Sequence, residues 1–173
     1  MMKDFCQVYH FLKSLQVAMT SSVLVLLPLL CLLTSPGSGQ ICNTSGWLTF
    51  EKNQYLLVDG PNFRTYSDAI NYCRSLGGDL AVITSNEQNA FLNTFTLKHG
   101  DFNYWIGLND LDGDGIYTWI NRTTMSGYSN LRAVSQRPAG PGECIRLRAK
   151  HDGQWDEANC TDLRRHICQR PKG

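Results

Sequence analysis

Tyr104-Trp105-Ile106-Gly107-Leu108 is the stretch of sequence that decides the fold. Its aromatic and aliphatic residues, interrupted by a single glycine, predict a strand. A second aromatic segment, Tyr117-Thr118-Trp119-Ile120, predicts another strand beyond a short acidic turn. These two segments lie in the middle of the chain, and the remaining elements are placed around them.

Two helices are predicted before this pair of strands. The first covers residues 66–76 with Thr65 as its N-cap, and Gly77-Gly78 ends it. The second begins after Ser85, which forms a capping-box pattern with the following residues, and runs to about Leu97. The apolar residues at helical spacing are Ala69, Ile70, Cys73 and Leu76 in the first helix, and Ala90, Phe91 and Phe95 in the second.

Short strands and one long loop complete the expected fold. The further strands are expected within residues 47–59, 80–83, 143–148, 154–155 and 166–168. Residues 121–142 are rich in Ser, Gly, Asn, Pro and Thr, and loops of this length inside a small domain are usually functional. The sequence therefore predicts an α+β fold in which two helices flank small antiparallel sheets and a long irregular loop.

Composition restricts the class of protein. The chain has 173 residues, of which 42% are hydrophobic and 18% charged, with seven cysteines and a net charge of +1. This length suits one globular domain with or without a tail, and the small net charge argues against nucleic acid as a partner. The cysteine content is high for a cytosolic protein.

The N-terminal region predicts secretion. Residues 23–33 form an apolar block of eleven residues, preceded by Lys3 and Lys13 and followed by a small, turn-prone segment. This is the length of a signal-peptide core and too short to cross a bilayer. We expect a signal peptide over residues 1–39 and a mature extracellular domain over residues 40–173. The alternative is an uncleaved membrane anchor that begins near Leu15.

The remaining residues carry a family pattern. The matching positions are Gly46-Trp47, Phe50, 69–73, 80–83, 105–108, Asn109-Asp110-Leu111, Gly115, Tyr117, Trp119, Cys144, Gly153-Gln154-Trp155, Cys160 and Cys168. From about Cys42 to its end, the chain resembles the C-type lectin-like domain family. The WIGL sequence alone is a weak signal. Together with four cysteines in this order, and Trp155 five residues before Cys160, it is a strong one.

The resemblance implies two disulfides, Cys73–Cys168 and Cys144–Cys160. The sequence alone leaves fifteen pairings open, from five choices of the unpaired cysteine and three connectivities each. Longer family members carry a further N-terminal bridge, but here Gln54 stands where a partner for Cys42 is expected. Cys42 is therefore our candidate for the interchain bond of a homodimer, and a thiol capped by a small molecule is the alternative.

The resemblance also implies a calcium site that binds sugar, and the sequence departs from it. Family members that bind sugar present Glu-Pro-Asn or Gln-Pro-Asp in the long loop, where this chain has Arg137-Pro138-Ala139. Arg137 brings a positive charge, and the Ala139 side chain offers no oxygen to Ca²⁺. Asp156 and Glu157 stand where the family has its Trp-Asn-Asp acids. Glu143 lies at a further ligand-like position.

A second calcium position is suggested by the acidic segment after the central strand. Acids at the positions of Asp110 and Asp114 bind an accessory Ca²⁺ in the family, and Glu143 is the third candidate ligand. The alternative interpretation is an acidic turn that is simply solvated.

Other residues are candidates for ligand binding or modification. Tyr128, in the long loop, is the aromatic residue expected to face a ligand, and a mobile, exposed tyrosine is the alternative. A group of basic residues could recognise anionic glycans or could be balanced surface charge: Arg132, Arg137, Arg146, Arg148, Lys150, Arg164 and Arg165. Asn43 and Asn121 begin plausible N-glycosylation sequons, whereas the sequon at Asn159 is disfavoured because Cys160 occupies its middle position.

The expected function is that of a binding protein. His99, His151 and His166 lack the partners of a metal or acid–base site, so no enzyme activity is expected. We expect a secreted lectin-like protein that binds carbohydrate or a glycoprotein through its long-loop face, with a degenerate sugar-coordinating calcium site. The alternative is calcium-independent binding of a protein, mineral or anionic glycan by the same fold.

Overall fold

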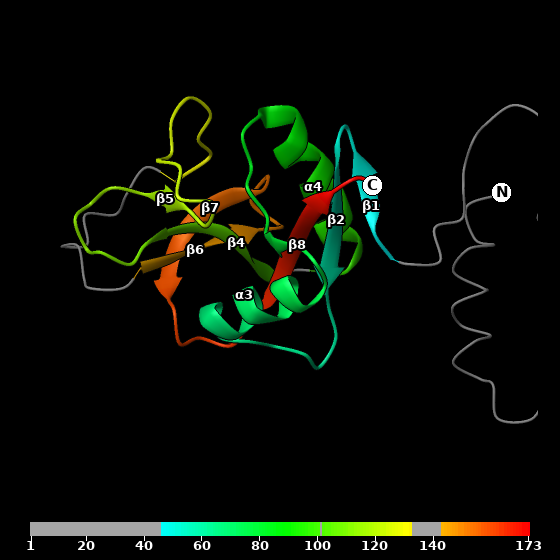
Figure 1. Cartoon of the computed structure of the whole chain (residues 1–173), viewed down its shortest axis with the longest axis horizontal. Helices are drawn as coiled ribbons and strands as arrows, with labels where there is room; N and C mark the ends of the chain where they lie inside the picture. Colours follow the sequence, from blue (N-terminus) through cyan, green and yellow to red (C-terminus); the bar gives the residue numbers. More distant parts are fainter. Residues whose placement is uncertain (1–45, 101, 133–142) are drawn as a thin grey trace, which may run out of the picture. The chain divides into compact units, whose positions relative to one another are not determined.

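The computed structural model describes residues 46–100, 102–132 and 143–173, within a compact unit that extends from Ser45 to Gly173 (Figure 1). The elements in chain order are β1 (Leu48–Phe50), β2 (Asn53–Val58), α3 (Tyr66–Ser75), β3 (Asp79–Leu80), α4 (Asn86–Lys98), β4 (Asn103–Asp110), β5 (Thr118–Trp119), β6 (Glu143–Arg148), β7 (Gln154–Asn159) and β8 (Arg165–Pro171). The α+β class, the two helices and the strand at the WIGL segment are confirmed. No helix in these ranges is both long and apolar enough to cross a membrane.

The strands form one sheet in the order β1-β2-β8-β4-β6-β7, with β3 added to β8 and β5 to β4. The pairs are antiparallel except β4 and β8, which run parallel and align Trp105 with His166. In Figure 1, β6 and β7 lie on one side of β8, and β1 and β2 lie on the other. The last strand of the chain therefore lies between the first strands and the central ones.

One helix packs on each face of this sheet. Consecutive residues of a strand point to opposite faces. On β4, Tyr104 and Ile106 pack in the cluster that contains Leu92 of α4, whereas Trp105 packs in the cluster that contains Ala69 of α3. The two clusters are the two halves of the core. The four tryptophans Trp47, Trp105, Trp119 and Trp155 are all buried in them.

The helix starts are set by their caps. The Thr65 hydroxyl accepts a hydrogen bond from the Asp68 amide at 3.2 Å, and the Ser85 hydroxyl accepts one from the Gln88 amide at 3.1 Å. Both N-caps were predicted. A full capping box would also have the Gln88 side chain accept from the Ser85 amide. Instead, the Gln88 side chain accepts from the Thr84 amide and donates to the Tyr55 hydroxyl.

The apolar face of α4 is only partly buried. Ala90 is exposed and Phe91 and Phe95 are half-buried, whereas the buried positions are mostly polar. These buried residues are Gln88, Asn89, Leu92, Asn93 and Thr96. Amide side chains are tolerated there because they bind buried groups of the sheet. Counting apolar residues does not detect such a face.

Two disulfides close the domain, and both predicted pairings are present. Cys73 of α3 joins Cys168 of β8 with a Cα–Cα distance of 5.3 Å, and Cys144 of β6 joins Cys160 after β7 at 5.1 Å. The bridges span 95 and 16 residues of sequence. Cys42 lies outside the described residues, so the interchain bond stays a prediction.

Candidate ligand-binding site

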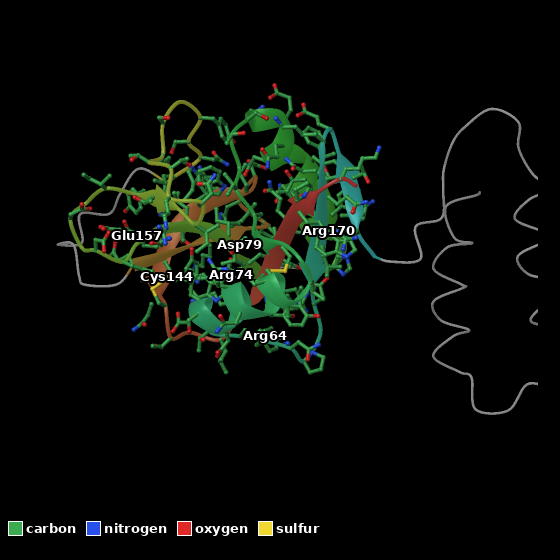
Figure 2. All side chains as sticks on the ribbon, in the orientation of Figure 1. Arg64, Arg74, Asp79, Cys144, Glu157 and Arg170 are labelled. Atoms are coloured by element: carbon green, nitrogen blue, oxygen red, sulfur yellow. A yellow bond between two sulfur atoms is a disulfide. The ribbon has the colours of Figure 1, made fainter. Side chains whose placement is uncertain are left out.

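The candidate site lies at the long-loop end of the domain, where β4 ends, β6 begins and β7 ends. Glu157 and Cys144 lie at this end, and Arg170 lies at the other (Figure 2). Arg137 and Pro138 belong to residues 133–142, which are outside the described ranges. The described part of the site consists of its strands and residues 121–132 of the long loop.

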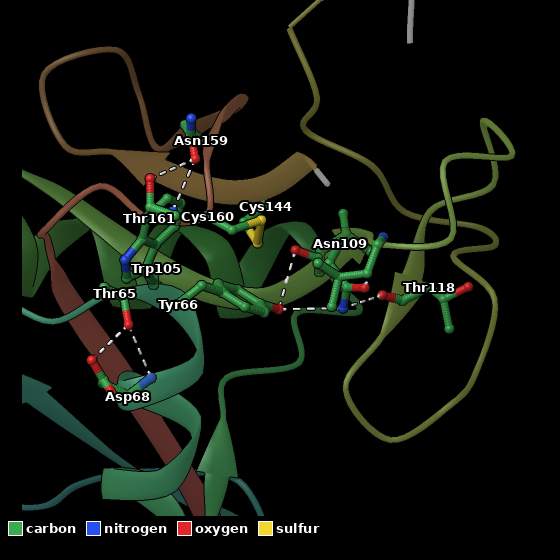
Figure 3. The surroundings of a disulfide bond; sticks show 12 residues. Thr65, Tyr66, Asp68, Trp105, Asn109, Thr118, Cys144, Asn159, Cys160 and Thr161 are labelled. Carbon is green, nitrogen blue, oxygen red and sulfur yellow. Dashed lines mark hydrogen bonds between the residues drawn. A yellow bond between two sulfur atoms is a disulfide. The ribbon is translucent and has the colours of Figure 1, made fainter. Parts of the chain in front are cut away.

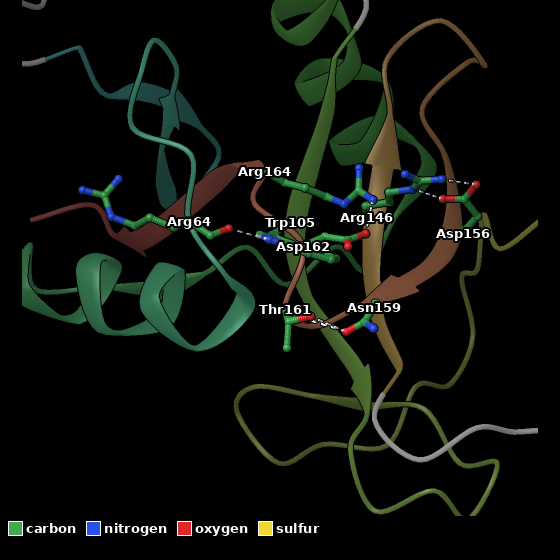
Figure 4. Close-up of polar contacts among 8 residues, drawn as sticks. All are labelled: Arg64, Trp105, Arg146, Asp156, Asn159, Thr161, Asp162 and Arg164. Atoms are coloured by element: carbon green, nitrogen blue, oxygen red, sulfur yellow. Dashed lines mark hydrogen bonds and ion pairs between the residues drawn. The ribbon is translucent and has the colours of Figure 1, made fainter.

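Asp156 is held by two arginines of the neighbouring strand. Its carboxylate receives Arg146 Nε at 2.5 Å and Nη2 at 3.3 Å, and Arg148 Nε lies 3.4 Å from Oδ2 (Figure 4). The three side chains are about one-fifth exposed, at 19%, 21% and 18%. Charge-assisted bonds of this kind are stronger than neutral ones. The Asp156 oxygens are thus engaged by protein cations.

Glu157 lies on the opposite face of β7. It is aligned with the buried Ile145, whereas Asp156 is aligned with Arg146. The Tyr117 hydroxyl donates a hydrogen bond to Glu157 Oε1. Since successive strand residues point to opposite faces, the two acids of β7 do not converge on one point.

The acidic segment after β4 is organised by its own backbone. The two carboxylate oxygens of Asp110 accept hydrogen bonds from the amides of Asp114 and Gly115, each at 3.1 Å. Asp114 in turn accepts from the Ile116 amide at 2.8 Å. Asp110 is buried and Asp114 is exposed, so Asp110 acts as the internal acceptor of this turn.

Glu143 brings a further acid to this end of the sheet. The β4–β6–β7 register places it directly between Asp110 and Asn159. Burial raises the pKa of the Tyr117 phenol above its ordinary value. The hydrogen bond and charge of Glu157, then the charges of Glu143 and Asp110, add to this rise. Tyr117 is therefore a neutral donor among three carboxylates.

The two pairs of acids at this end of the sheet differ in how well they could bind calcium. Ca²⁺ takes six to eight oxygen ligands. The pair Asp156 and Glu157 does not fit a shared ion, because the two carboxylates face opposite ways and are already bonded. Asp110 and Glu143 are adjacent, and each carboxylate oxygen has a second lone pair. Among the described side chains, the one group of three close enough to hold a metal is Cys73, His166 and Cys168. The two cysteines of this group form a disulfide with each other.

The matching family model is that of the lectin C-type domain, and it covers residues 63–170. The chain belongs to the C-type lectin domain family. Lectins are binding proteins, and neither the family nor the fold indicates catalysis.

Relatives of this lectin domain come from several animals. It is 29% identical to the perlucin-like protein of Mytilus galloprovincialis over 72% of this chain and 80% of that protein. It is 28% identical to human collectin-10 over 70% of this chain, but it spans only 42% of that relative. The carbohydrate-recognition domain of cow CD23, solved in the presence of a GlcNAc2Man3 oligosaccharide, is 30% identical. That match covers 75% of this chain and 95% of the other, with a TM-score of 0.62.

The other predicted site residues differ in their exposure. Tyr128 is half-buried, and its ring meets Trp155 edge-on with centroids 5.7 Å apart, so much of it packs rather than faces solvent. Asn121 is exposed, and Asn43 is outside the described ranges. Tyr117 was predicted only as a strand residue. Its alternation with Trp119 gave no sign that its hydroxyl would reach Glu157.

The basic residues divide into two groups. Arg146, Arg148 and Arg164 lie on one face with Asp156 and Asp162, and Arg164 Nη2 is 2.5 Å from Asp162 Oδ2 (Figure 4). Burial lowers the pKa of Arg164, and its guanidinium lies 5.2 Å from the Trp105 ring centroid. Arg165 is separate. It pairs with Asp59 at 2.9 Å and stacks on Phe102.

Proposed function

We propose that this C-type lectin domain binds carbohydrate at its long-loop face, without a calcium ion that joins protein and sugar. One observation carries the proposal. Asp156 and Glu157, the acids that would share such an ion, lie on opposite faces of β7, and each already has a protein partner. Moving Asp156 to an ion would leave two partly buried guanidinium groups without their acceptor, which is costly.

Support for carbohydrate as the ligand comes from family membership and from cow CD23, which was solved with an oligosaccharide. In the proposed mode, protein groups bind the sugar hydroxyls directly. Glu143 and Glu157 supply acceptors, and the exposed edge of Tyr128 supplies an apolar contact. The loop around Arg137 and Pro138 would complete the face.

A second ligand class, anionic glycans, is favoured by the charges beside Asp156. Three arginines, Arg146, Arg148 and Arg164, share two acids, so one positive charge is left over on this face. A sulfate or carboxylate of a glycan can accept the forked hydrogen bonds of a guanidinium group. This candidate uses the α3 face of β6 and β7 rather than the face of Glu157.

We also propose an extracellular location, with residues 1–39 removed as a signal peptide and Cys42 joining two chains. The two disulfides support this proposal because such bridges persist in oxidising compartments. Intact mass of the protein recovered from culture medium tests the cleavage. Electrophoresis with and without reductant, on the chain and on C42S, tests the dimer.

The experiment that tests the function is a glycan array probed in calcium and again in excess chelator. Binding that is equal in both buffers is the expected result. Binding lost in chelator would show that calcium joins protein and sugar and would overturn the proposed mechanism. Absence of binding in both buffers would overturn carbohydrate as the ligand.

A pair of matched variants separates the two faces. R146Q/R148Q should lower binding to sulfated or sialylated glycans at least several-fold if the arginine face is the site, and leave neutral glycans unchanged. R74Q is the control, because it removes an arginine that pairs with an acid, Asp79 at 3.1 Å, outside this face. Loss of neutral-glycan binding in E157Q would instead place the site at the long-loop face.

A further inference from the structure

Two N-glycosylation sequons in the described chain have the same local geometry. In Asn121-Arg122-Thr123, the Asn121 side-chain oxygen accepts from the Thr123 hydroxyl at 2.6 Å and from its amide at 3.1 Å. In Asn159-Cys160-Thr161, Asn159 accepts from the Thr161 hydroxyl at 2.8 Å and from its amide at 3.0 Å (Figure 3). The sequence pattern separates these sites, but the structure does not.

The acceptor nitrogen of Asn159 donates to none of the described residues. Asn159 is exposed, and among the described residues its Nδ2 donates no hydrogen bond, as is also true of Asn121. Asn130 and Asn109 show the contrasting case, since their Nδ2 atoms bind the carbonyls of Gly153 and Thr118 at 2.9 and 3.2 Å. A sugar attached to Asn159 would therefore break no side-chain hydrogen bond to the part of the chain that the structure describes.

Asn159 lies at the exposed end of a strand. It is the last residue of β7, the last strand in the order of the sheet, and residues 130–132 pair with the outer edge of this strand at Trp155, four positions earlier. Its side chain points to the face opposite Ala158, which packs in the core beside Cys144. The glycan would leave from the sheet edge beside Glu143, its cross-strand partner.

Cys160 limits when the site can be modified rather than whether it can. Its sulfur is bonded to Cys144, its carbonyl accepts from the Tyr66 amide at 2.9 Å, and the Asn159 carbonyl accepts from the Asp162 amide at 2.9 Å. These bonds hold the backbone of the sequon in the folded domain. A transferase that must seat the sequon in its own site therefore has access before the disulfide closes.

We infer that Asn159 is an N-glycosylation site of this lectin, filled in competition with closure of the Cys144–Cys160 bridge. Asn159 Nδ2 forms a bond to C1 of the reducing sugar of a lipid-pyrophosphate-linked oligosaccharide. The C1–oxygen bond to the pyrophosphate breaks, the lipid pyrophosphate leaves, and one amide proton passes to a base of the transferase. The inference rests on entry into the secretory pathway, which is part of the proposed function.

The test is site-by-site occupancy of the full chain secreted from cultured animal cells. Enzymatic removal of glycans in heavy-oxygen water converts each occupied asparagine to labelled aspartate, which peptide mass spectrometry reads. We expect label at Asn159 in a fraction of molecules. N159Q and T161A should each lose one glycan from the intact mass, and T161S should keep it. C144S should raise the labelled fraction, since the bridge can no longer close.

Asn121 in the same molecules is the internal control. Label at Asn121 with none at Asn159, in the natural chain and in C144S, would overturn the inference and leave the extracellular proposal standing. Absence of label at all three sequons of the secreted chain would also overturn the inference, whereas absence of the chain from the medium would overturn the extracellular proposal. Failure of the glycan array would not affect the result, because occupancy is read from the protein itself and not from ligand binding.

Discussion

The two disulfides of this lectin share one apolar cluster but border different surroundings. Around Cys73–Cys168, the neighbours are the apolar residues of α3 and β8, and neither ring nitrogen of the buried His166 nearby bonds to any described residue. Around Cys144–Cys160, the neighbours include the charged ends of β6 and β7, where Asp156 and Glu157 are both bonded. The same covalent bond thus closes a mainly apolar region and a region that borders polar networks.

The difference suggests a division of roles. The first bridge spans 95 residues and joins the beginning of the domain to its end, so it acts chiefly on the stability of the whole. The second spans 16 residues and holds the strands that carry the candidate site, so it acts chiefly on the shape of that face. Four predictions test this division, from the largest expected effect to the smallest.

Removing the longer bridge should cost the most stability. In the chain-entropy model, C73A/C168A loses about 4.6 kcal/mol of unfolding free energy and C144A/C160A about 3 kcal/mol. Denaturant midpoints of the two double variants and of the parent chain measure the difference. Equal losses would show that the two regions do not differ in this respect.

Acid should weaken the apolar region through His166. Burial, and then the charge of Arg64, lower the pKa of His166 to about 4, against 6.5 for an unperturbed histidine. Between about pH 4 and pH 6.5, His166 is protonated in the unfolded chain and neutral in the folded domain. Stability is therefore complete above about pH 6.5 and falls as the pH approaches 4, by up to about 3 kcal/mol.

The comparison of unfolding free energies at several pH values checks the role of His166. H166F should remove this part of the pH dependence, because the phenyl ring binds no proton. H151Q controls for the loss of a histidine as such, since His151 lies in the exposed turn between β6 and β7. An unchanged slope in H166F would contradict the prediction.

Asp156 should contribute more to the unfolding free energy than a more exposed acid that also pairs with arginine. D156A leaves Arg146 and Arg148 without their shared acceptor and should cost about 2 kcal/mol. D79A breaks the pair with Arg74, whose side chains are 33% and 55% exposed, and should cost less than about 1 kcal/mol. Thermal and denaturant unfolding compare the two. A smaller loss of stability in D156A than in D79A would show that the pairing of Asp156 with Arg146 and Arg148 does not stabilise the fold.

Calcium should have the smallest effect, through the pair Asp110 and Glu143. If this pair holds the accessory ion, calcium at about ten times its Kd raises stability by about 1.4 kcal/mol. E143Q should abolish the gain, and D112N, which changes an exposed acid of the same turn, should retain it. No shift in melting temperature at any millimolar calcium concentration would favour the solvated turn.

Much of the framework was predictable because it depends on local patterns. Thr65 and Ser85 cap the helices as their residue types indicate, and the strand at Trp105 follows from its own composition. The parallel pairing of β4 with β8 was not predicted, because it joins segments about sixty residues apart. The disulfide pairing came from the family resemblance rather than from the chain itself.

The candidate site was predictable as a set of residues but not as an arrangement. The sequence places Asp156 and Glu157 side by side, and only the register with β6 shows that one meets Arg146 while the other faces Tyr117. Likewise, Asn89 carries no signal in the sequence, although it accepts the indole N–H of Trp155 at 2.8 Å. Such pairs are separated by 10 to 66 residues, so they depend on the completed sheet.

The pairing of β2 with β8 has a mechanical consequence. The described domain begins just before β1 and ends after β8, and β2 pairs with both of these strands; the Lys172 amide still bonds to the Lys52 carbonyl at 2.9 Å. A pulling force applied between residue 46 and Gly173 would first load this three-stranded ladder. Once it parted, only residues 46–72 and 169–173 could extend, because the Cys73–Cys168 bridge keeps the intervening chain out of the line of force. The face formed by β6 and β7 would thus keep its shape under tension that has already opened the first strands.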